Sequence, residues 1–136
     1  MASKFTGGCL CGAVRYECVA EPIFMGNCHC RDCQKVSGGA YAPEIGLPAA
    51  ALKITGTAKY HDTKADSGNT LSRGFCPECG TRLFAKTSAM PDLAMIGAGT
   101  LDNPSLYAPA MDIFTASAQH WDYMNPALAK FPKMPI

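Results

Sequence analysis

The chain lacks any long hydrophobic run and any cluster of basic residues, and both absences exclude classes of protein. No apolar stretch approaches the roughly 18–20 residues that a membrane-spanning helix needs, so we expect no membrane partner. Lys and Arg total 12 against 11 Asp and Glu, a net charge of +1. Because these cations are scattered along the chain, no nucleic-acid partner is expected. The N-terminus also lacks the apolar core of a signal peptide, which predicts a cytoplasmic protein.

The chain has no internal repeat, no low-complexity tract and no linker between compositionally different halves. Its 136 residues fit one domain, and we expect residues 1–136 to form it. Hydrophobic residues make up 48% of the chain, a value typical of folded proteins, so disorder is not expected. A domain of this size often gains stability from a bound metal.

Helix signals are scarce, and the pattern predicts a mainly β protein with little helix. In residues 13–19 the apolar side chains of Val14, Tyr16 and Cys18 alternate with polar ones, which is typical of a half-buried strand. Similar short runs bounded by Gly and Pro follow. The predicted strands are residues 13–19, 23–27, 41–45, 52–60, 70–75, 81–86, 93–97 and 113–115, with a loop at residues 62–69.

Two short helices are predicted. The first spans residues 31–37 and is ended by Gly38 and Gly39. The second begins after Asn125, which can cap it, and runs to about residue 130.

Cysteine is the residue type that this chain has in excess, and seven of its eight cysteines lie in three short clusters. Cysteines two or three positions apart bridge to each other with difficulty, but their sulfurs can bind one metal ion. Without a secretion signal, reduced thiols and metal binding are favoured over disulfides. The clusters are Cys9 and Cys11; Cys28, Cys30 and Cys33; and Cys76 and Cys79.

The two outer pairs predict a structural zinc site. Four thiolates complete a tetrahedron around zinc and leave no position for a substrate. Gly80 follows the second pair and Gly12 follows the first, as expected for tight turns that need a positive φ. A redox Cys-x-x-Cys pair is the alternative, but no βαβ pattern surrounds it. The ligands would be Cys9, Cys11, Cys76 and Cys79.

The middle cluster is one ligand short, which predicts a catalytic-type zinc. Cys28, Cys30 and Cys33 can face one ion and leave a position open for water or substrate, so we assign all three as metal-binding and catalytic. His29 lies between two of them and would point to the opposite side of an extended chain, so a hydrogen-bonding role is favoured over ligation. A second structural site completed by His, Asp or water is the alternative. The remaining cysteine, Cys18, is interpreted as a small buried hydrophobe.

A zinc with three thiolates and an open position suits activation of a small thiol, or of a carbonyl that a thiol attacks. Such an addition moves a proton, so a general acid or base is expected near the middle cluster. Candidates near neutral pH are His29, His61 and His120. His61 is more typical of a solvated loop residue, and Glu44 of an ordinary strand residue. Trp121 and Tyr123 could line the site or pack under the C-terminal tail, and core packing is favoured.

The cysteine clusters and their neighbours carry a resemblance that covers almost the whole chain. The matching segments are residues 7–16, 28–38 and 73–81, with Asp112, Ile113, Phe114, Ser117, Trp121, Phe131 and Pro132 near the C-terminus. They resemble the family of glutathione-dependent formaldehyde-activating enzyme and centromere protein V. The resemblance implies a β-tent fold, in which small antiparallel sheets are held together by zinc.

The same resemblance implies two zinc ions per chain. The structural ion would be held by Cys9, Cys11, Cys76 and Cys79, and the catalytic-type ion by Cys28, Cys30 and Cys33. The implied activity is that of a carbon–sulfur lyase, with a small thiol and an aldehyde as partners: glutathione and formaldehyde give S-hydroxymethylglutathione. Two other functions stay open, a non-catalytic two-zinc binding module and a sensor of thiols or metal.

The chain departs from the family pattern in residues 115–120, where members often carry a basic residue. Glutathione has two carboxylates, and arginine is the usual side chain for binding them. Arg31 and Arg73 are the best candidates in this sequence.

Overall fold

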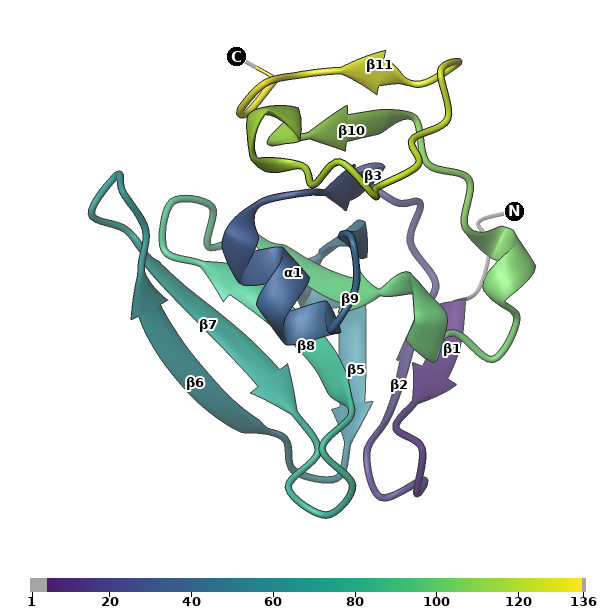
Figure 1. The fold of residues 1–136 in the computed structure, drawn as a ribbon. Helices are drawn as coiled ribbons and strands as arrows, with labels where there is room; N and C mark the ends of the chain where they lie inside the picture. Colours follow the sequence, from purple (N-terminus) through teal and green to yellow (C-terminus); the bar gives the residue numbers. More distant parts are fainter. Residues whose placement is uncertain (1–4, 136) are drawn as a thin grey trace.

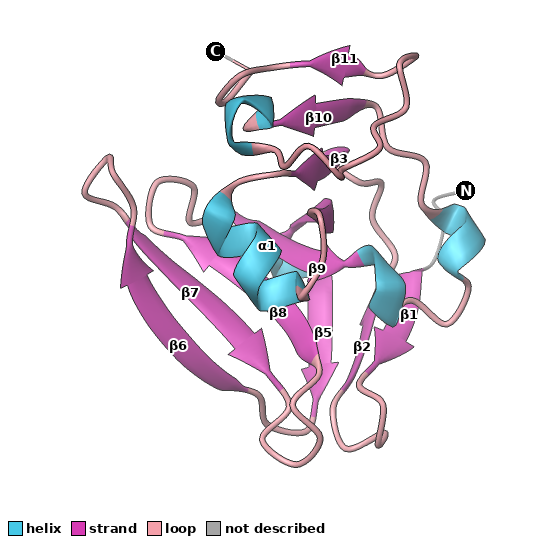
Figure 2. Cartoon of the chain, viewed as in Figure 1, coloured by secondary structure: helices cyan, strands magenta, loops and turns pink. Residues whose placement is uncertain are grey.

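A computed structural model describes residues 5–135 and shows a mainly β protein (Figures 1 and 2). Within these residues the strands form a three-stranded sheet, β1–β2–β5, and an eight-stranded sheet in the order β11–β10–β3–β4–β9–β8–β7–β6. The strands are β1 (Phe5–Gly8), β2 (Arg15–Cys18), β3 (Phe24–Cys28), β4 (Ala42–Pro48), β5 (Leu52–Thr55), β6 (Lys59–Lys64), β7 (Thr70–Phe75), β8 (Arg82–Thr87), β9 (Leu93–Gly97), β10 (Met111–Ile113) and β11 (Ala129–Lys130).

The alternation of apolar and polar side chains predicted for residues 13–19, which contain β2, is confirmed. Val14, Tyr16 and Cys18 are each at most 3% exposed, and they pack in the main core between the two sheets. The ring of Tyr16 meets that of Phe84 edge-on at 5.7 Å, and its hydroxyl lies 2.8 Å from Thr100 Oγ1. Burial of each such side chain contributes about 1.5–3 kcal/mol, so this core holds the small sheet against the large one.

The predicted strand at residues 52–60 is wrong, because the chain turns in its middle. β5 ends at Thr55, and β6 begins at Lys59 in the other sheet. Gly56 between them has a φ of 88°, and a Cβ there would lie 2.2 Å from the carbonyl oxygen of Ala13. Glycine is required at such a turn. The predicted loop at residues 62–69 begins later, since β6 continues to Lys64.

The predicted C-terminal helix is also wrong. Asn125 Oδ1 accepts a hydrogen bond from the backbone N–H of Ala127 and forms a turn, after which the chain runs into β11 (Ala129–Lys130). β10 lies between β3 and β11 and pairs with both in parallel, so this edge departs from the predicted antiparallel pattern. The backbone N–H of Phe131 also binds the carbonyl of Asp112, and these long-range bonds outweigh the local helix signal.

The helix predicted at residues 31–37 is confirmed as α1 (Arg31–Ser37). Cys30 caps its start, and Gly38 ends it with a φ of 72° and an N–H bond to the carbonyl of Gln34. Short 3₁₀ helices occupy Ala49–Ala51, Ala98–Thr100, Pro104–Leu106 and Thr115–Ser117. In the described part of the chain no helix has the length and apolar character needed to cross a bilayer.

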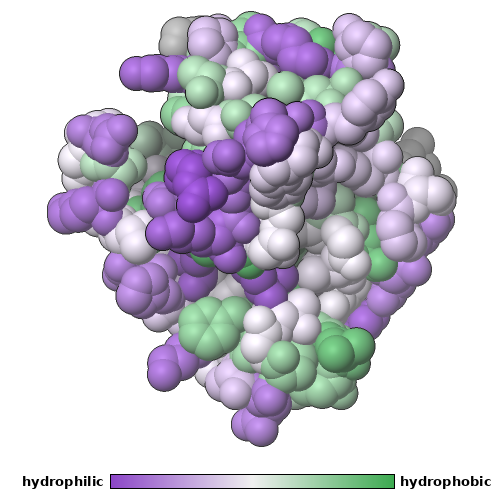
Figure 3. Space-filling view, in the orientation of Figure 1, coloured by the Kyte–Doolittle hydropathy of each residue, from purple (hydrophilic) through white to green (hydrophobic). Residues whose placement is uncertain are grey.

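α1 lies in front of the large sheet, and hydrophilic side chains gather over it in the middle of this face of the molecule (Figures 1 and 3). The parallel edge β3–β10–β11 lies beside the start of α1. This arrangement brings the middle cysteine cluster, the face of the large sheet and the C-terminal segment together.

Candidate metal centres and their surroundings

The four outer cysteines come together although 64 residues separate Cys11 from Cys76 in the sequence. Their sulfurs all lie within 4.8 Å of one another. Cys11 Sγ is 3.6 Å from Cys9 Sγ and 3.8 Å from Cys76 Sγ. A tetrahedron of thiolates around zinc has edges of about 3.8 Å, so this donor set fits the ion. That it binds zinc stays a prediction.

Two turns hold this quartet. Cys9 and Cys11 lie between β1 and β2, and Cys76 and Cys79 lie between β7 and β8. Gly12 and Gly80 follow them with φ of 83° and 77°, in agreement with the predicted turns. Backbone N–H groups point at the sulfurs, from Val14 to Cys9 at 3.3 Å and from Glu78 to Cys76 at 3.4 Å.

The local hydrogen bonds favour the thiolate form of Cys79. The Thr81 hydroxyl lies 3.2 Å from the sulfur of Cys79, and this contact lowers the pKa of Cys79 to about 5. Metal ions bind the thiolate form of cysteine, so a low pKa at this position suits metal binding.

The three middle cysteines form a second group, and residues 5–135 contain no third cluster of side chains arranged to hold a metal ion. Cys28 ends β3, Cys30 caps α1, and Cys33 lies in its first turn. Their sulfurs lie within 4.8 Å of one another. The sulfur of Cys30 accepts the backbone N–H of Cys33 at 3.3 Å, so the start of the helix orients the cluster.

Electrostatics distinguish Cys30 from its neighbours. Hydrogen bonds from the thiols of Cys28 and Cys33, followed by the charge of Arg73, lower the pKa of the Cys30 thiol. The neighbouring thiols, together with burial, raise the pKa of Cys33. A lowered thiol pKa at Cys30 suits metal binding or a reactive sulfur.

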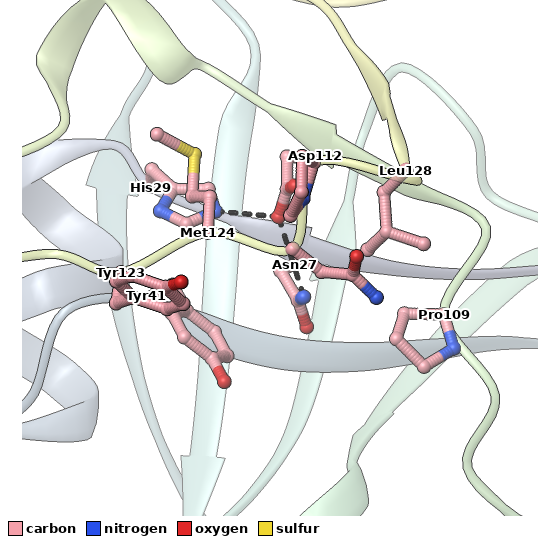
Figure 4. A pocket seen from close by; sticks show the side chains of 10 residues that line it. Asn27, His29, Tyr41, Pro109, Asp112, Tyr123, Met124 and Leu128 are labelled. Atoms are coloured by element: carbon pink, nitrogen blue, oxygen red, sulfur yellow. Dashed lines mark hydrogen bonds and ion pairs between the residues drawn. The ribbon is translucent and has the colours of Figure 1, made fainter.

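His29 is not placed to complete the middle cluster. Its Nε2 lies 2.7 Å from Asp112 Oδ1, and its Nδ1 contacts the carboxylate of Asp122. The ring is fully buried, and it lines a pocket together with Asn27 and Tyr41 (Figure 4). Both ring nitrogens are therefore engaged, which confirms the predicted hydrogen-bonding role.

Comparison with known proteins identifies the family to which this arrangement belongs. The family model described as "Glutathione-dependent formaldehyde-activating enzyme" matches residues 4–117. The chain belongs to this family. Its match includes all three cysteine clusters and ends with the 3₁₀ helix Thr115–Ser117.

One named protein and one solved structure are similar to this chain. A Halomonas elongata protein named "Putative glutathione-dependent formaldehyde-activating enzyme" is 30% identical over 102 residues, which are 71% of this chain and 65% of the relative. The match thus spans just under two thirds of that protein. A crystal structure of a Rhodobacter sphaeroides protein has a TM-score of 0.58 at 17% identity, covering 93% of this chain and 98% of the other. This second likeness shows the fold alone.

The protein has a groove of about 350 Å³ between α1 and the large sheet. Asp32, Lys35 and Val36 line it from the helix, and His61, Thr63 and Arg73 line it from β6 and β7. Arg73 also donates a hydrogen bond to Thr63 Oγ1 at 3.0 Å. Of the two arginines predicted for carboxylate binding, Arg73 therefore lies in an open groove, whereas Arg31 donates to Gln34 Oε1 on its own helix.

A buried ion pair beside this groove was not expected from the sequence. Glu44 on β4 is 5% exposed, and its Oε1 lies 2.6 Å from Arg82 Nη2. Glu44 is therefore more than the ordinary strand residue that was predicted. Its burial arises from the central position of β4 in the sheet, and no local motif encodes that position.

Three further expectations from the sequence can be compared with the structure. Trp121 and Tyr123 are 57% and 92% exposed, so the prediction that they pack in the core is wrong. His61 is exposed as predicted, but it lies within β6 and pairs with Arg73 on β7. Cys18 is 1% exposed and belongs to the main hydrophobic core, which confirms its interpretation.

Proposed function

We propose that this protein is a zinc-dependent carbon–sulfur lyase-type enzyme that joins a small aldehyde such as formaldehyde to a thiol such as glutathione. Residues 1–136 would act as one domain in the cytoplasm, where thiols stay reduced. The family match and the name of the Halomonas relative support the class of reaction. Zinc would be held by Cys28, Cys30 and Cys33 at the reactive site, and by the outer four cysteines at the structural one.

One observation carries this proposal: three sulfurs converge within 4.8 Å, and the nearest histidine is turned away from them. Three thiolates leave a coordination position open, whereas the outer quartet leaves none. Zinc bound there would supply Lewis acidity to a thiol or a carbonyl oxygen.

The residues around the cluster would bind and orient the substrate. The groove beside α1 offers the cations of Lys35 and Arg73, which can bind the carboxylates of a thiol such as glutathione. Asp32 at its rim would favour a substrate that also carries an amino group. Both ends of glutathione thus have complementary groups in the groove.

The proposal is tested by following formaldehyde consumption with glutathione, above the rate of spontaneous addition in protein-free buffer. We expect Cys30→Ala to lose activity at least about a hundredfold, because even residues that only support metal ligands cost 10–100-fold when changed. The zinc content of Cys30→Ala should be one ion per chain, compared with two in the wild type.

Cys18→Ala is the matched control, because it also removes a buried thiol but lies outside both clusters. It should keep both zinc ions and the wild-type rate. The proposal fails if the wild-type protein shows no turnover with glutathione or a small neutral thiol, or if Cys30→Ala is as active as Cys18→Ala.

A further inference from the structure

We propose that Glu44 is the proton-transfer residue of the middle site, taking the proton of the substrate thiol and returning it to the aldehyde oxygen. This inference rests on the proposed function, since it assigns a role within that reaction. It adds a residue that lies outside the cysteine clusters and outside the sequence motifs.

The register of the sheet places Glu44 on the same face as the cluster. Ala42 pairs with Cys28 and packs against Cys28 and Cys33. Side chains two positions apart on a strand share a face, so Glu44 lies next to Ala42 on the α1 side of β4, about 7 Å further along.

Glycines flank Glu44 on the neighbouring strands, and Met111 fills the space over one of them, since a Cβ at Gly26 would lie 2.9 Å from Met111 Cγ. The two glycines paired with Glu44 are Gly26 on β3 and Gly97 on β9. Arg82 lies over Gly97, where a Cβ would be 3.6 Å from its Nη1. Arg82 therefore binds the carboxylate, and the two paired glycines contribute no side chain beside it.

One oxygen of the carboxylate is held and the other is free to act. Oε1 binds Arg82, whereas Oε2 is buried and has no hydrogen-bond partner within residues 5–135. Buried carboxylate oxygens are nearly always paired, because leaving one unpaired costs free energy. A carboxylate that is fixed by an arginine through one oxygen and is unpaired at the other can accept a proton from a bound substrate at the unpaired oxygen.

Glu44 interacts electrostatically with Cys30 of the middle cluster and with two arginines. The groups that act on it are Arg82 on β8, Arg73 on β7 and Cys30 at the start of α1, and its own charge acts on Tyr107. Burial raises the pKa of the Glu44 carboxyl, and the two arginines only partly offset this. A general base works best when its pKa lies close to the working pH, so this direction favours the role.

The proposed step is balanced without any further reactant. The S–H bond of the thiol breaks and its proton goes to Oε2 of Glu44. The sulfur lone pair then forms the new bond to the aldehyde carbon, and the C=O π electrons move to oxygen. That oxygen takes the proton from Glu44, which leaves the hydroxymethyl thioether and an ionised Glu44.

Glu44→Gln tests this role, because it keeps the size of the side chain and an acceptor for Arg82. The control is Asp102→Asn, which also converts an ion-paired carboxylate to an amide, in the exposed pair with Arg15. With formaldehyde and glutathione, we expect Glu44→Gln to lower kcat about 10²–10⁴-fold, the range of general acid–base catalysis. KM should change little, and Asp102→Asn should match the wild type.

Proton release gives a second readout that does not depend on turnover. Glutathione binding is followed by calorimetry in two buffers that differ in ionisation enthalpy. Glu44→Gln should release to the buffer about one more proton per bound glutathione than the wild type does, because its amide cannot take the thiol proton. Both proteins should hold two zinc ions.

The inference is overturned if Glu44→Gln keeps the wild-type kcat and the wild-type proton release while the wild type is active. If the wild type is inactive, both the proposed function and this role of Glu44 are refuted. If Glu44→Gln does not fold, Glu44→Asp decides: a lower kcat with a shifted pH profile supports the role, and an unchanged kcat and profile refute it.

Discussion

Nε2 of His29 lies 2.7 Å from Oδ1 of Asp112, a residue 83 positions further along the chain. The other oxygen of Asp112 binds Lys130 Nζ at 2.8 Å, and Asp122 contacts the second ring nitrogen of His29. The histidine between two cysteines of the middle cluster is thus held by the C-terminal segment.

Asp112→Asn should destabilise the protein strongly. It removes the charge of a buried carboxylate that pairs with buried His29 and with Lys130, which is 34% exposed. Breaking a buried ion pair from one side costs about 3–5 kcal/mol, so the free energy of unfolding in urea should fall by that amount. Asp102→Asn, in an exposed pair, should change it little. Equal effects of the two substitutions would contradict the importance of this network.

The two cysteine groups should differ in what they contribute to stability. Cys76→Ala removes a fully buried member of the quartet that joins β1–β2 to β7–β8. Zinc contributes on the order of 10 kcal/mol to folding in zinc-finger peptides, so we expect a loss of several kcal/mol and of one zinc ion. Cys30→Ala should also lose one ion but keep most of the stability. Zinc analysis and denaturant unfolding of both variants measure this, and a reversed order would refute the division of roles.

Gly80→Ala tests the turn of the second cysteine pair. Gly80 has a φ of 77° and no atom within 4 Å of an added Cβ, so backbone strain is the only cost. A left-handed conformation costs an L-residue about 1–2 kcal/mol, and thermal unfolding should show a loss of that size. At Gly99, where space is equally open and φ is not positive, alanine should be neutral or slightly stabilising. A loss at Gly99 as large as at Gly80 would argue against strain.

The raised pKa of Glu44 predicts a pH-dependent stability. A carboxyl whose pKa is higher in the folded state contributes stability below its unfolded pKa, and this contribution is lost as the pH rises through the folded pKa. Relative to Glu44→Gln, the wild type should therefore become less stable as the pH increases from about 4.5, the ordinary value for Glu. Urea unfolding at several pH values up to about 8 checks this. A constant difference between the two proteins would mean that the pKa is not raised.

The cysteine groups were predictable from sequence because metal-ligand geometry is largely local. The spacing of Cys28, Cys30 and Cys33 restricts where their sulfurs can lie, and Gly80 marks the turn after Cys79. The helix α1 was predictable for the same reason, since Gly38 ends it by a local rule. The hydrogen-bonding role of His29 was correctly predicted from the alternation of an extended chain.

The residues that surround the cluster were not predictable, because their positions depend on the assembled sheet. Glu44 is buried because β3 and β9 flank its strand, and both neighbours at its level are glycines. Residues after Asn125 have a good local helix signal, yet parallel pairing with β10 draws them into a strand. Trp121 is exposed because it precedes Asp122, whose side chain takes the buried position against His29.

The parallel pairing of β10 with β3 also sets an order of assembly on the ribosome. Cys33 and Cys79 are synthesised well before residues 111–113, so both sulfur groups exist while the last strands are still missing. Pairing across such long loops is slow, because the loop must be closed before any contact forms. A nascent chain thus has both sulfur groups early, but its middle thiol cluster lacks the support of the C-terminal segment until that segment folds over His29.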